Sequence, residues 1–408
     1  MELVHRRCAG LDVHKEEVVA GVRVVERGRL EQVTERFGTT TQELLRLGDW
    51  LEGWRIRDVV MEATGVYWKP VWHILEERFA LVLVNARDAR NRPGRKSDVS
   101  DAAWLAELLA FGLIRGSFVP PEPIQQVRDL TRARTQLVHR IGQGTLRVQK
   151  VLEDANIKIA GVVTDLLGAS GRAILHALIE GETDPERLLA RTTGRLKAPR
   201  ERLLAGLYGR VTDHHRFLLG FHLGQIESDE AFLATIQTEI ARVLEPFRRQ
   251  FERLITIPGV STTVATILIG EIGVDMSRFP SDGHLVSWAG LCPRMDESAG
   301  RRRSTRIRPG NPWLKTALVQ SAWAAVRVKD SYLRSQFLRL RARRGPKKAI
   351  IAVAASILTA VFHMLSHDLP YHDLGAAHLD RLDKTRTARR LVRRLEHLGY
   401  SVNLTEAA

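Results

Sequence analysis

Two short apolar runs near the start of the chain each end in a carboxylate. Asp12 follows Gly10 and Leu11, and Glu62 closes the run that begins at Val59. Short apolar runs of this kind are typical of buried strands. Acids at the ends of two buried strands can converge on one point, so this pair limits how the first part of the chain folds.

A second pair of acids stands at the start of an Ala/Leu-rich helical pattern. Asp98 and Asp101 are three residues apart, which places both on one face of the first turn. Ser97 is the expected N-cap, and the helix dipole favours acids at this end. Taken alone, the pair fits two solvated capping acids equally well. Together with Asp12 and Glu62 it predicts a site for Mg²⁺, with Mn²⁺ as an alternative, because hard cations take oxygen ligands and paired metals assist phosphoryl transfer.

The charge of the chain is concentrated in one segment. The 408 residues carry a net charge of +15, and the segment from Arg294 to Lys348 contains 16 Lys or Arg against 3 Asp or Glu, a net +13. This localisation favours a binding surface for a polyanion over a chain that is merely basic and soluble. The residues predicted to contact nucleic acid are Gly259, Arg301, Arg302, Arg303, Arg306, Arg308, Lys347 and Lys348.

The remaining composition predicts a cytoplasmic protein. Cys8 and Cys292 lie far apart without metal-ligand spacing, which suits a reducing compartment. The N-terminus has no signal-peptide pattern. The apolar run from Ala349 to Leu365 is short for a membrane span and contains polar residues, so we expect a buried helix there and no membrane contact.

The pattern of elements predicts four parts. Residues 1–112 fit an α/β domain with RNase H-like layers. Residues 113–252 contain two long amphipathic helices that flank shorter ones; an antiparallel coiled-coil arm used for dimerisation is favoured over a compact helical domain. Residues 253–370 form a mostly helical third domain. Residues 371–408 are a basic helical tail, which fits a solvated helix and an extra nucleic-acid backbone contact equally well.

Several individual elements can also be placed from the pattern. In the first part we expect strand over 8–25 and 32–37, with a turn at Gly28, and shorter strands over 58–61 and 80–84. Helices are expected over 41–54 and 67–78. In the later parts we expect helices over 217–251, interrupted near Pro246, and over 311–327.

Two loops of the third domain carry candidate chemistry. Residues 257–260, Ile-Pro-Gly-Val, resemble the turn of a helix-hairpin-helix, where Gly259 would let backbone N–H groups approach a phosphate; an ordinary helical turn looks the same. Ser298 precedes Arg301–Arg303, and guanidinium groups can hold a phosphodiester. On spacing alone, a phosphate ligand or plain loop residue is favoured over an attacking nucleophile for Ser298.

Six motifs, in this order, resemble the bacterial insertion-sequence transposases of the IS-one-ten family. Members of that family join an N-terminal RuvC-like DEDD domain to a C-terminal serine-bearing transposase domain. Each motif is weak alone, whereas their order is specific. The motifs are Gly10–Lys15, Glu62–Trp68, Lys96–Ala102, Ile257–Val260, Ala289–Pro293, and Glu297–Gly300 followed by Gly310–Leu314.

The resemblance assigns roles to five residues. It implies that the recombinase serine is Ser298, with Ser304 as a fallback. Many relatives follow the serine motif with Lys where this chain has Arg301, which keeps the charge but replaces a point charge with a planar fork. The family's four metal-binding acids fall on Asp12, Glu62, Asp98 and Asp101.

The resemblance also implies a mechanism and partners. The expected enzyme is a Mg²⁺-dependent DNA transposase or recombinase that cuts and rejoins strands through a covalent phosphoserine. Its partners would be the DNA of the element ends and of the target, a structured non-coding guide RNA, and further copies of the chain in a dimer or tetramer. The long separation between the acids and Ser298 allows a site shared between protomers.

Two rival functions remain open on the sequence. A structure-selective nuclease of the Holliday-junction resolvase type would use the four acids without Ser298. A non-catalytic nucleic-acid-binding scaffold would use the helix-hairpin-helix-like turn and the basic loops alone, and its acids could be neutralised without effect.

Overall fold

A computed structural model describes most of the chain. The described residues are 3–85, 100–114, 116–161, 163, 165–193, 198–294, 296–298, 300–304, 306–382 and 384–405, without the side chains of residues 160, 296–298, 302, 303 and 386. They divide into two units, Met1–Val119 and Pro120–Ala408.

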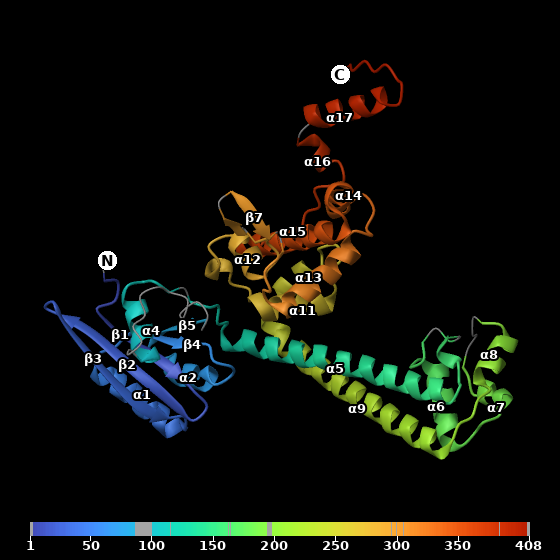
Figure 1. Cartoon of the computed structure of the whole chain (residues 1–408), viewed down its shortest axis with the longest axis horizontal. Helices are drawn as coiled ribbons and strands as arrows, with labels where there is room; N and C mark the ends of the chain where they lie inside the picture. Colours follow the sequence, from blue (N-terminus) through green and yellow to red (C-terminus); the bar gives the residue numbers. More distant parts are fainter. Residues whose placement is uncertain are drawn as a thin grey trace. The chain divides into compact units, whose positions relative to one another are not determined.

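The first unit is built on a mixed five-stranded sheet in the order β3-β2-β1-β4-β5 (Figure 1). Strand β1 pairs antiparallel with β2 and parallel with β4, and the outer pairs are β2–β3 antiparallel and β4–β5 parallel. The strands are β1 (Arg7–Val13), β2 (Glu17–Glu26), β3 (Arg29–Gly38), β4 (Asp58–Glu62) and β5 (Ala80–Val84). The prediction of an α/β first domain is confirmed.

Helices cover both faces of this sheet. On one face, α1 (Thr41–Gly53) and α2 (Trp68–Leu75) pack on side chains such as Leu11 and Met61. On the other face, α4 (Asp101–Ala110) packs on Cys8 and Val60. Because side chains alternate along a strand, β1 and β4 are apolar on both faces for most of their length.

The start of the sheet differs in detail from the sequence prediction. The single strand expected over 8–25 is two strands, β1 and β2, joined by the exposed segment His14–Glu16. The expected turn at Gly28 is confirmed, since Arg27 and Gly28 join β2 to β3 with φ angles of 49° and 79°. Two successive left-handed residues are typical of the tight hairpin turns that match the twist of a sheet.

The second unit is dominated by helices. Its first half contains α5 (Glu122–Asp154), η1 (Ile159–Gly161), α6 (Ala169–Glu180), α7 (Pro185–Ala190), α8 (Arg200–Leu207), α9 (Asp213–Leu244), η2 (Glu245–Phe247) and α10 (Arg248–Leu254). Its second half contains α11 (Thr262–Ile272), η3 (Met276–Arg278), α12 (Asp282–Trp288), β6 (Asp296–Ser298), β7 (Arg301–Ser304), α13 (Pro312–Ala325), α14 (Tyr332–Arg344), α15 (Pro346–His367), α16 (His378–Arg381) and α17 (Lys384–Glu396).

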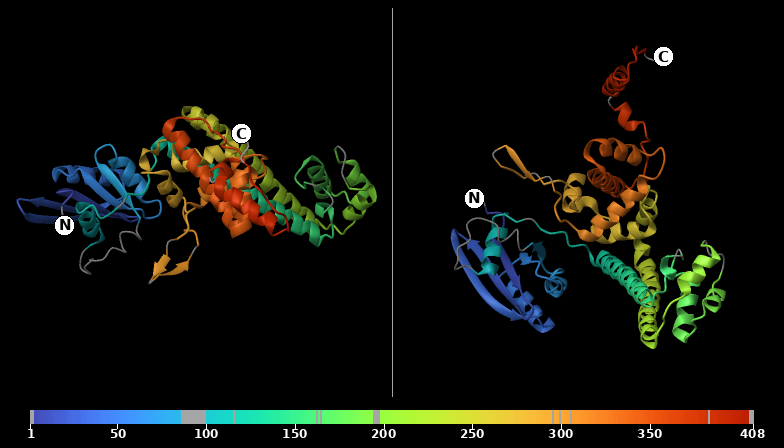
Figure 2. Two further views of the ribbon diagram at one scale, coloured as in Figure 1. Left: turned by 90° about the horizontal axis from the view of Figure 1, so that it is seen from above. Right: turned by 45° about the vertical axis from the view of Figure 1, so that its right-hand side comes forward.

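The two long helices α5 and α9 lie side by side and run in opposite directions (Figure 2). A Cβ on Gly144 would lie 2.8 Å from Ile226, and nearer the far end His215 lies 3.0 Å from Asp154. The capping box of Thr212 and His215 starts α9, earlier than the sequence predicted. The expected pair of long helices is confirmed; its use in dimerisation stays a prediction.

Helix α15 is the core of the second half. Its buried residues, which include Val353 and Ile357, face α12, α13 and α14. Among the described helices it alone is long and apolar enough to cross a membrane by length and composition, a test that core helices also pass. Its packing fits the buried helix expected from the sequence.

Candidate functional site

Asp12 and Glu62 lie at the carboxyl ends of adjacent strands. In the parallel pair β1–β4, Leu11 is opposite Met61, and the next residue on each strand is the acid. The side chain of Asp12 is 18% exposed and Glu62 is 5% exposed. Adjacent strands are about 4.8 Å apart, so the two carboxylates are close neighbours on the sheet.

Both acids are on the face that α4 covers. Cys8 and Val60 belong to the apolar cluster with α4, and two-residue periodicity places Asp12 and Glu62 on the same side as these residues. The helix runs antiparallel to β1. A Cβ on Gly10 would lie 2.2 Å from the Ala102 carbonyl oxygen, whereas the Cys8 thiol donates to the Ala106 carbonyl at 3.3 Å.

The first residue of α4 is Asp101, so the antiparallel path directs this acid toward the ends of β1 and β4 that carry Asp12 and Glu62. The hydroxyl of Ser100 accepts from the Ala103 N–H at 3.2 Å and caps the helix. The prediction of Ser97 as the cap is therefore wrong: both serines precede an aspartate, and the later one has the capping geometry.

Asp98 lies outside the described residues. Within the described ranges, no group of three or more His, Cys, Asp or Glu is close enough to hold a metal ion. The neighbouring carboxylates Asp12 and Glu62 supply the oxygen donors that a hard divalent cation prefers. The pair therefore fits a Mg²⁺ site by donor chemistry.

His14, a residue of the Gly10–Lys15 motif, is a neighbour of this site. Its Nε2 lies 3.1 Å from Oδ2 of Asp12, and its side chain is about half exposed. A residue two positions after a strand-end acid stays on the same side of the chain, which is the pattern that could have identified it.

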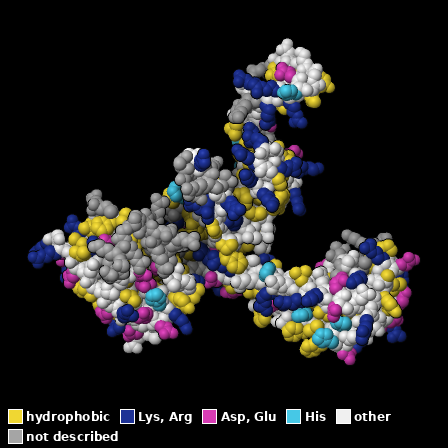
Figure 3. Space-filling model, viewed as in Figure 1, with side chains coloured by type: hydrophobic (Ala, Val, Ile, Leu, Met, Phe, Trp, Pro, Cys, Tyr) yellow, Lys and Arg dark blue, Asp and Glu magenta, His cyan; other side chains and the backbone are white. Residues whose placement is uncertain are grey.

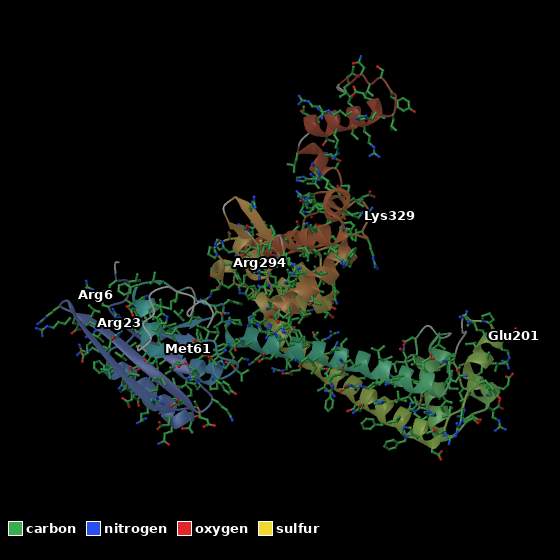
Figure 4. The ribbon with its side chains drawn as sticks, viewed as in Figure 1. Arg6, Arg23, Met61, Glu201, Arg294 and Lys329 are labelled. Carbon is green, nitrogen blue, oxygen red and sulfur yellow. The ribbon has the colours of Figure 1, made fainter. Side chains whose placement is uncertain are left out.

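Ser298 belongs to a two-stranded hairpin in the second unit. Strands β6 and β7 pair antiparallel, with Ser298 opposite Arg301, and Gly300 turns the chain with φ of 73°. The ladder continues toward the base, where Pro293 is bridged to Ile307 and the Arg294 N–H donates to the Arg306 carbonyl at 2.9 Å. We call residues 293–307 the serine finger; Figure 4 labels Arg294 at its base.

The neck of the serine finger is a close backbone crossing of two glycines. A Cβ on Gly310 would lie 2.4 Å from the Ala289 carbonyl oxygen and 2.6 Å from the Gly290 Cα. Both glycines have positive φ, 71° for Gly290 and 57° for Gly310. A larger residue at either position would open the crossing, because the conformation and the space both require glycine.

The charged residues predicted to contact nucleic acid are exposed wherever the structure describes their side chains. Among those whose side chains are described, Arg301, Arg306, Arg308, Lys347 and Lys348 are all exposed. Figure 3 shows dark-blue Lys and Arg side chains over the part of the second unit that carries its C-terminal helices. The side chains of Arg302 and Arg303 lie outside the description.

Position 259 requires glycine for a structural reason that the sequence did not reveal. It adopts φ of 83°, and a Cβ there would lie 2.3 Å from the Ser321 carbonyl oxygen and 2.6 Å from the Ala325 N. The glycine thus allows the turn before α11 to contact the backbone of α13. Its phosphate contact stays a prediction.

Two transposase family models match separate parts of the chain. A family model described as a transposase, of the DEDD IS110 type, matches residues 9–157. A second model, described as the transposase IS116/IS110/IS902 family, matches residues 251–338. The first match includes Asp12, Glu62, Asp98 and Asp101, and the second includes the whole serine finger.

Two curated proteins are also similar. The insertion element IS110 uncharacterized 43.6 kDa protein of Streptomyces coelicolor is 33% identical over 114 residues, which is 28% of each chain. The putative transposase y4rJ of Sinorhizobium fredii is 24% identical over 320 residues, covering 68% of this chain and 79% of the relative. The first similarity thus spans little more than a quarter of the relative's length.

Proposed function

Because the chain belongs to the IS110 (IS-one-ten) family of transposases, we propose that it is a DNA recombinase that moves an insertion sequence by cutting and rejoining strands through Ser298. The observation that carries the proposal is the pair Asp12 and Glu62 at adjacent strand ends, with the start of α4 directed toward them. The strand order 3-2-1-4-5 with helices on both faces supports an RNase H-like, RuvC-like domain.

The metal site would be formed by four acids. Asp98 precedes the first residue of α4 by three positions, so at most about 11 Å of chain separates the two Cα atoms. That reach is short enough for Asp98 to join Asp12, Glu62 and Asp101. Bound Mg²⁺ would neutralise charge that develops on the phosphate oxygens.

Ser298 would perform the covalent step. Its hydroxyl oxygen attacks the phosphorus of the scissile phosphodiester, the bond to the 3′ oxygen breaks, and the hydroxyl proton is passed to the departing 3′ oxygen. The resulting serine phosphodiester is reversed by a different 3′ hydroxyl, which joins the new strand and restores the serine. Arg301, the register partner of Ser298, would hold a non-bridging phosphate oxygen.

The basic helices would hold the nucleic-acid backbone. Lys347 and Lys348 are exposed in the first turn of α15, where the helix dipole disfavours cations and no side chain caps the helix. A phosphate at this end would satisfy both the lysines and the free N–H groups. A guide RNA and a working dimer or tetramer belong to the proposal through the family resemblance, as does a cytoplasmic, nucleoid-associated location.

The test is a denaturation-resistant adduct between the purified chain and labelled DNA containing an element end, in Mg²⁺. Ser298→Ala is expected to abolish the adduct, whereas Ser304→Ala, on the opposite strand of the finger, keeps it. Asp12→Asn and Glu62→Gln are expected to slow adduct formation by about a hundredfold, the equivalent of roughly 3 kcal/mol of lost charge stabilisation.

A matched control comes from the other end of β4. Asp58 lies 3.1 Å from His5 at the amino end of the strand, so Asp58→Asn removes a carboxylate from the same strand without touching the proposed metal site. DNA cleavage without any adduct, unaffected by Ser298→Ala, would favour the resolvase-type nuclease. DNA binding without cleavage in any variant would favour the scaffold.

A further inference from the structure

Glu271 is a fully buried carboxylate in the second unit. It is 0% exposed and occupies the last turn of α11, whose other buried residues are mostly apolar. Burying a charge is costly unless it is paired and hydrogen-bonded. A residue of this kind therefore needs partners, and the partners show which parts of the fold it joins.

Two side chains distant in sequence donate hydrogen bonds to the Glu271 carboxylate, and Arg128 forms a longer ion pair with it at 3.7 Å. Arg132 of α5 donates from Nε to Oε1 and from a terminal nitrogen to Oε2, both at 2.8 Å. Asn311 donates from Nδ2 to Oε2 at 2.6 Å. The Arg132 guanidinium also lies over the ring of Trp313, 5.7 Å from its centroid. The bidentate geometry fixes the direction of the contact as well as its charge.

The backbone around Glu271 is held by a second arginine of α5. Arg128 donates to the carbonyl oxygens of Gly270 and Glu271, both at 2.9 Å. These bonds satisfy carbonyl groups near the end of α11, where helical partners are missing. Helix α5 is thus attached to α11 through both side chain and backbone.

Asn311 connects this attachment to the serine finger. Its Oδ1 caps α13 by accepting from the N–H groups of Trp313 and Leu314 at 3.0 and 3.1 Å, while its Nδ2 binds Glu271. The preceding residue is Gly310, one of the two glycines of the neck. One amide group therefore ties the neck of the finger to α13 and, through Glu271, to α5.

We propose that Glu271 is a positioning residue that, through Asn311 and Arg132, fixes the neck of the serine finger on helix α5 and so sets the orientation of Ser298. The inference rests on the proposed function of Ser298. Apolar residues could fill the same space without the cost of burying a charge. They would not fix the orientation of the neck relative to α5, whereas the directed hydrogen bonds from Arg132 and Asn311 to the Glu271 carboxylate do. A small rotation at the neck is magnified at the tip, and a misplacement of about 1 Å at a reacting atom can cost about a hundredfold in rate.

Three substitutions test the network without removing the cap of α13. Asn311→Ser keeps an oxygen that can accept from the helix N–H groups but loses the donor to Glu271. Glu271→Gln keeps the shape and loses the charge. Arg132→Lys keeps the charge and loses the bidentate fork. A matched control is Thr212→Ala, which removes the N-cap of α9; the first turn of that helix lies beside Asp154, at the opposite end of α5 from Arg132.

The first readout is hydrogen–deuterium exchange of the segment 289–310 in the full chain. The three network variants are expected to exchange faster there than wild type, while Thr212→Ala changes exchange only near the start of α9. The second readout is the rate of adduct formation at saturating DNA. It is expected to fall about tenfold or more in the network variants. DNA affinity is expected to stay within about twofold, because binding and positioning are separate contributions.

The outcomes separate this inference from the proposed function. Unchanged exchange at 289–310 in Asn311→Ser and Glu271→Gln overturns the inference, even if Ser298 forms the adduct. Equal losses of rate and affinity also overturn it, because they indicate general unfolding rather than misplacement. Absence of any Ser298 adduct in wild type overturns the proposed function, and faster exchange in the variants would then leave only the attachment of the neck established.

Discussion

The carboxylates of the first unit and the serine of the second are supported differently. Asp12 and Glu62 end strands whose neighbouring residues are buried, and α4 packs on the sheet with no room for a side chain at Gly10. Ser298 is carried on a two-stranded finger that includes the exposed Arg301, and the backbone crossing of Gly290 and Gly310 supports the neck of this finger. Core packing thus fixes the acids, whereas a few directed contacts fix the serine.

The largest expected effect concerns the contact between β1 and α4. Gly10→Ala places a Cβ 2.2 Å from the Ala102 carbonyl and 2.6 Å from the Ala106 N, both backbone atoms that cannot move aside. We expect the free energy of unfolding of the first unit to fall by about 3 kcal/mol or more. Urea unfolding followed by circular dichroism measures it. Gly53→Ala, in α1 with open space around it, is the control and should be neutral or slightly stabilising. Equal behaviour of the two variants would contradict the tight packing of α4.

The neck and the tip of the serine finger offer the next comparison. Gly310 and Gly300 both have positive φ, so alanine costs about 1 kcal/mol at either position for the backbone alone. Gly310→Ala also meets the Ala289 carbonyl at 2.4 Å, whereas a Cβ on Gly300 meets nothing. We expect Gly310→Ala to lower Tm by several degrees more than Gly300→Ala. If the tip substitution proved the more damaging, the neck would not be the support of the finger.

A smaller effect is expected on the salt dependence of DNA binding, and it tests which unit holds the phosphates. The slope of log K against log salt for DNA binding is negative. In the double variant Lys347→Ala and Lys348→Ala its magnitude is expected to decrease by about two, about one for each lost phosphate contact. Arg29→Ala removes an exposed arginine from the first unit and should leave the slope unchanged. Filter binding over a range of salt concentrations measures it. A slope that changes only with Arg29 would place the phosphate contacts on the other unit.

The smallest expected effect concerns the reactivity of the two cysteine thiols. Burial raises the pKa of the Cys8 thiol to about 12, from an ordinary value of 9.0. Cys8 is fully buried and Cys292 is only half-buried, so native protein at pH 8 is expected to react with one equivalent of a thiol reagent, and unfolded protein with two. Because the folded-state pKa is the higher one, the thiol's contribution to stability is fully present below pH 9 and is lost as the pH rises from 9 toward 12. Fast labelling of both cysteines in the native chain would contradict the packing of β1 under α4.

Much of the first unit could be predicted because apolar periodicity identifies where its strands lie, although it did not identify the break that separates β1 from β2. Asp12 and Glu62 come together since each ends a buried run and the runs pair in parallel. The position of α4 could not be predicted, because it depends on the absence of a side chain at Gly10 and Gly21, and a glycine gives no pattern. The capping serine was missed because two Ser-Asp pairs stand three residues apart.

The second unit was predicted less completely because its key contacts are long-range. Glu271 is a lone acid in an apolar helix, which is the pattern that could have drawn attention to it, but its partners lie 139 and 40 residues away. The sequence around Gly259 fits a phosphate-binding turn and an ordinary helical turn equally, whereas the structure shows that the nearest neighbours of Gly259 belong to α13. Sequence spacing identifies local turns well and cannot distinguish a contact with a ligand from a contact with the fold.

The antiparallel pairing of α5 and α9 has an architectural consequence. The chain that leaves the pair at Asp154 returns at Asp213, and His215 holds the two ends together at 3.0 Å. The described helices between them pack on the far end of the hairpin, in one core with Val148 and Leu219, and added length in the segments that connect them costs little entropy. Insertions or deletions in those connecting segments, whether evolved or engineered, are expected to leave the contacts of Arg132 with Glu271, near the other end of α5, unchanged.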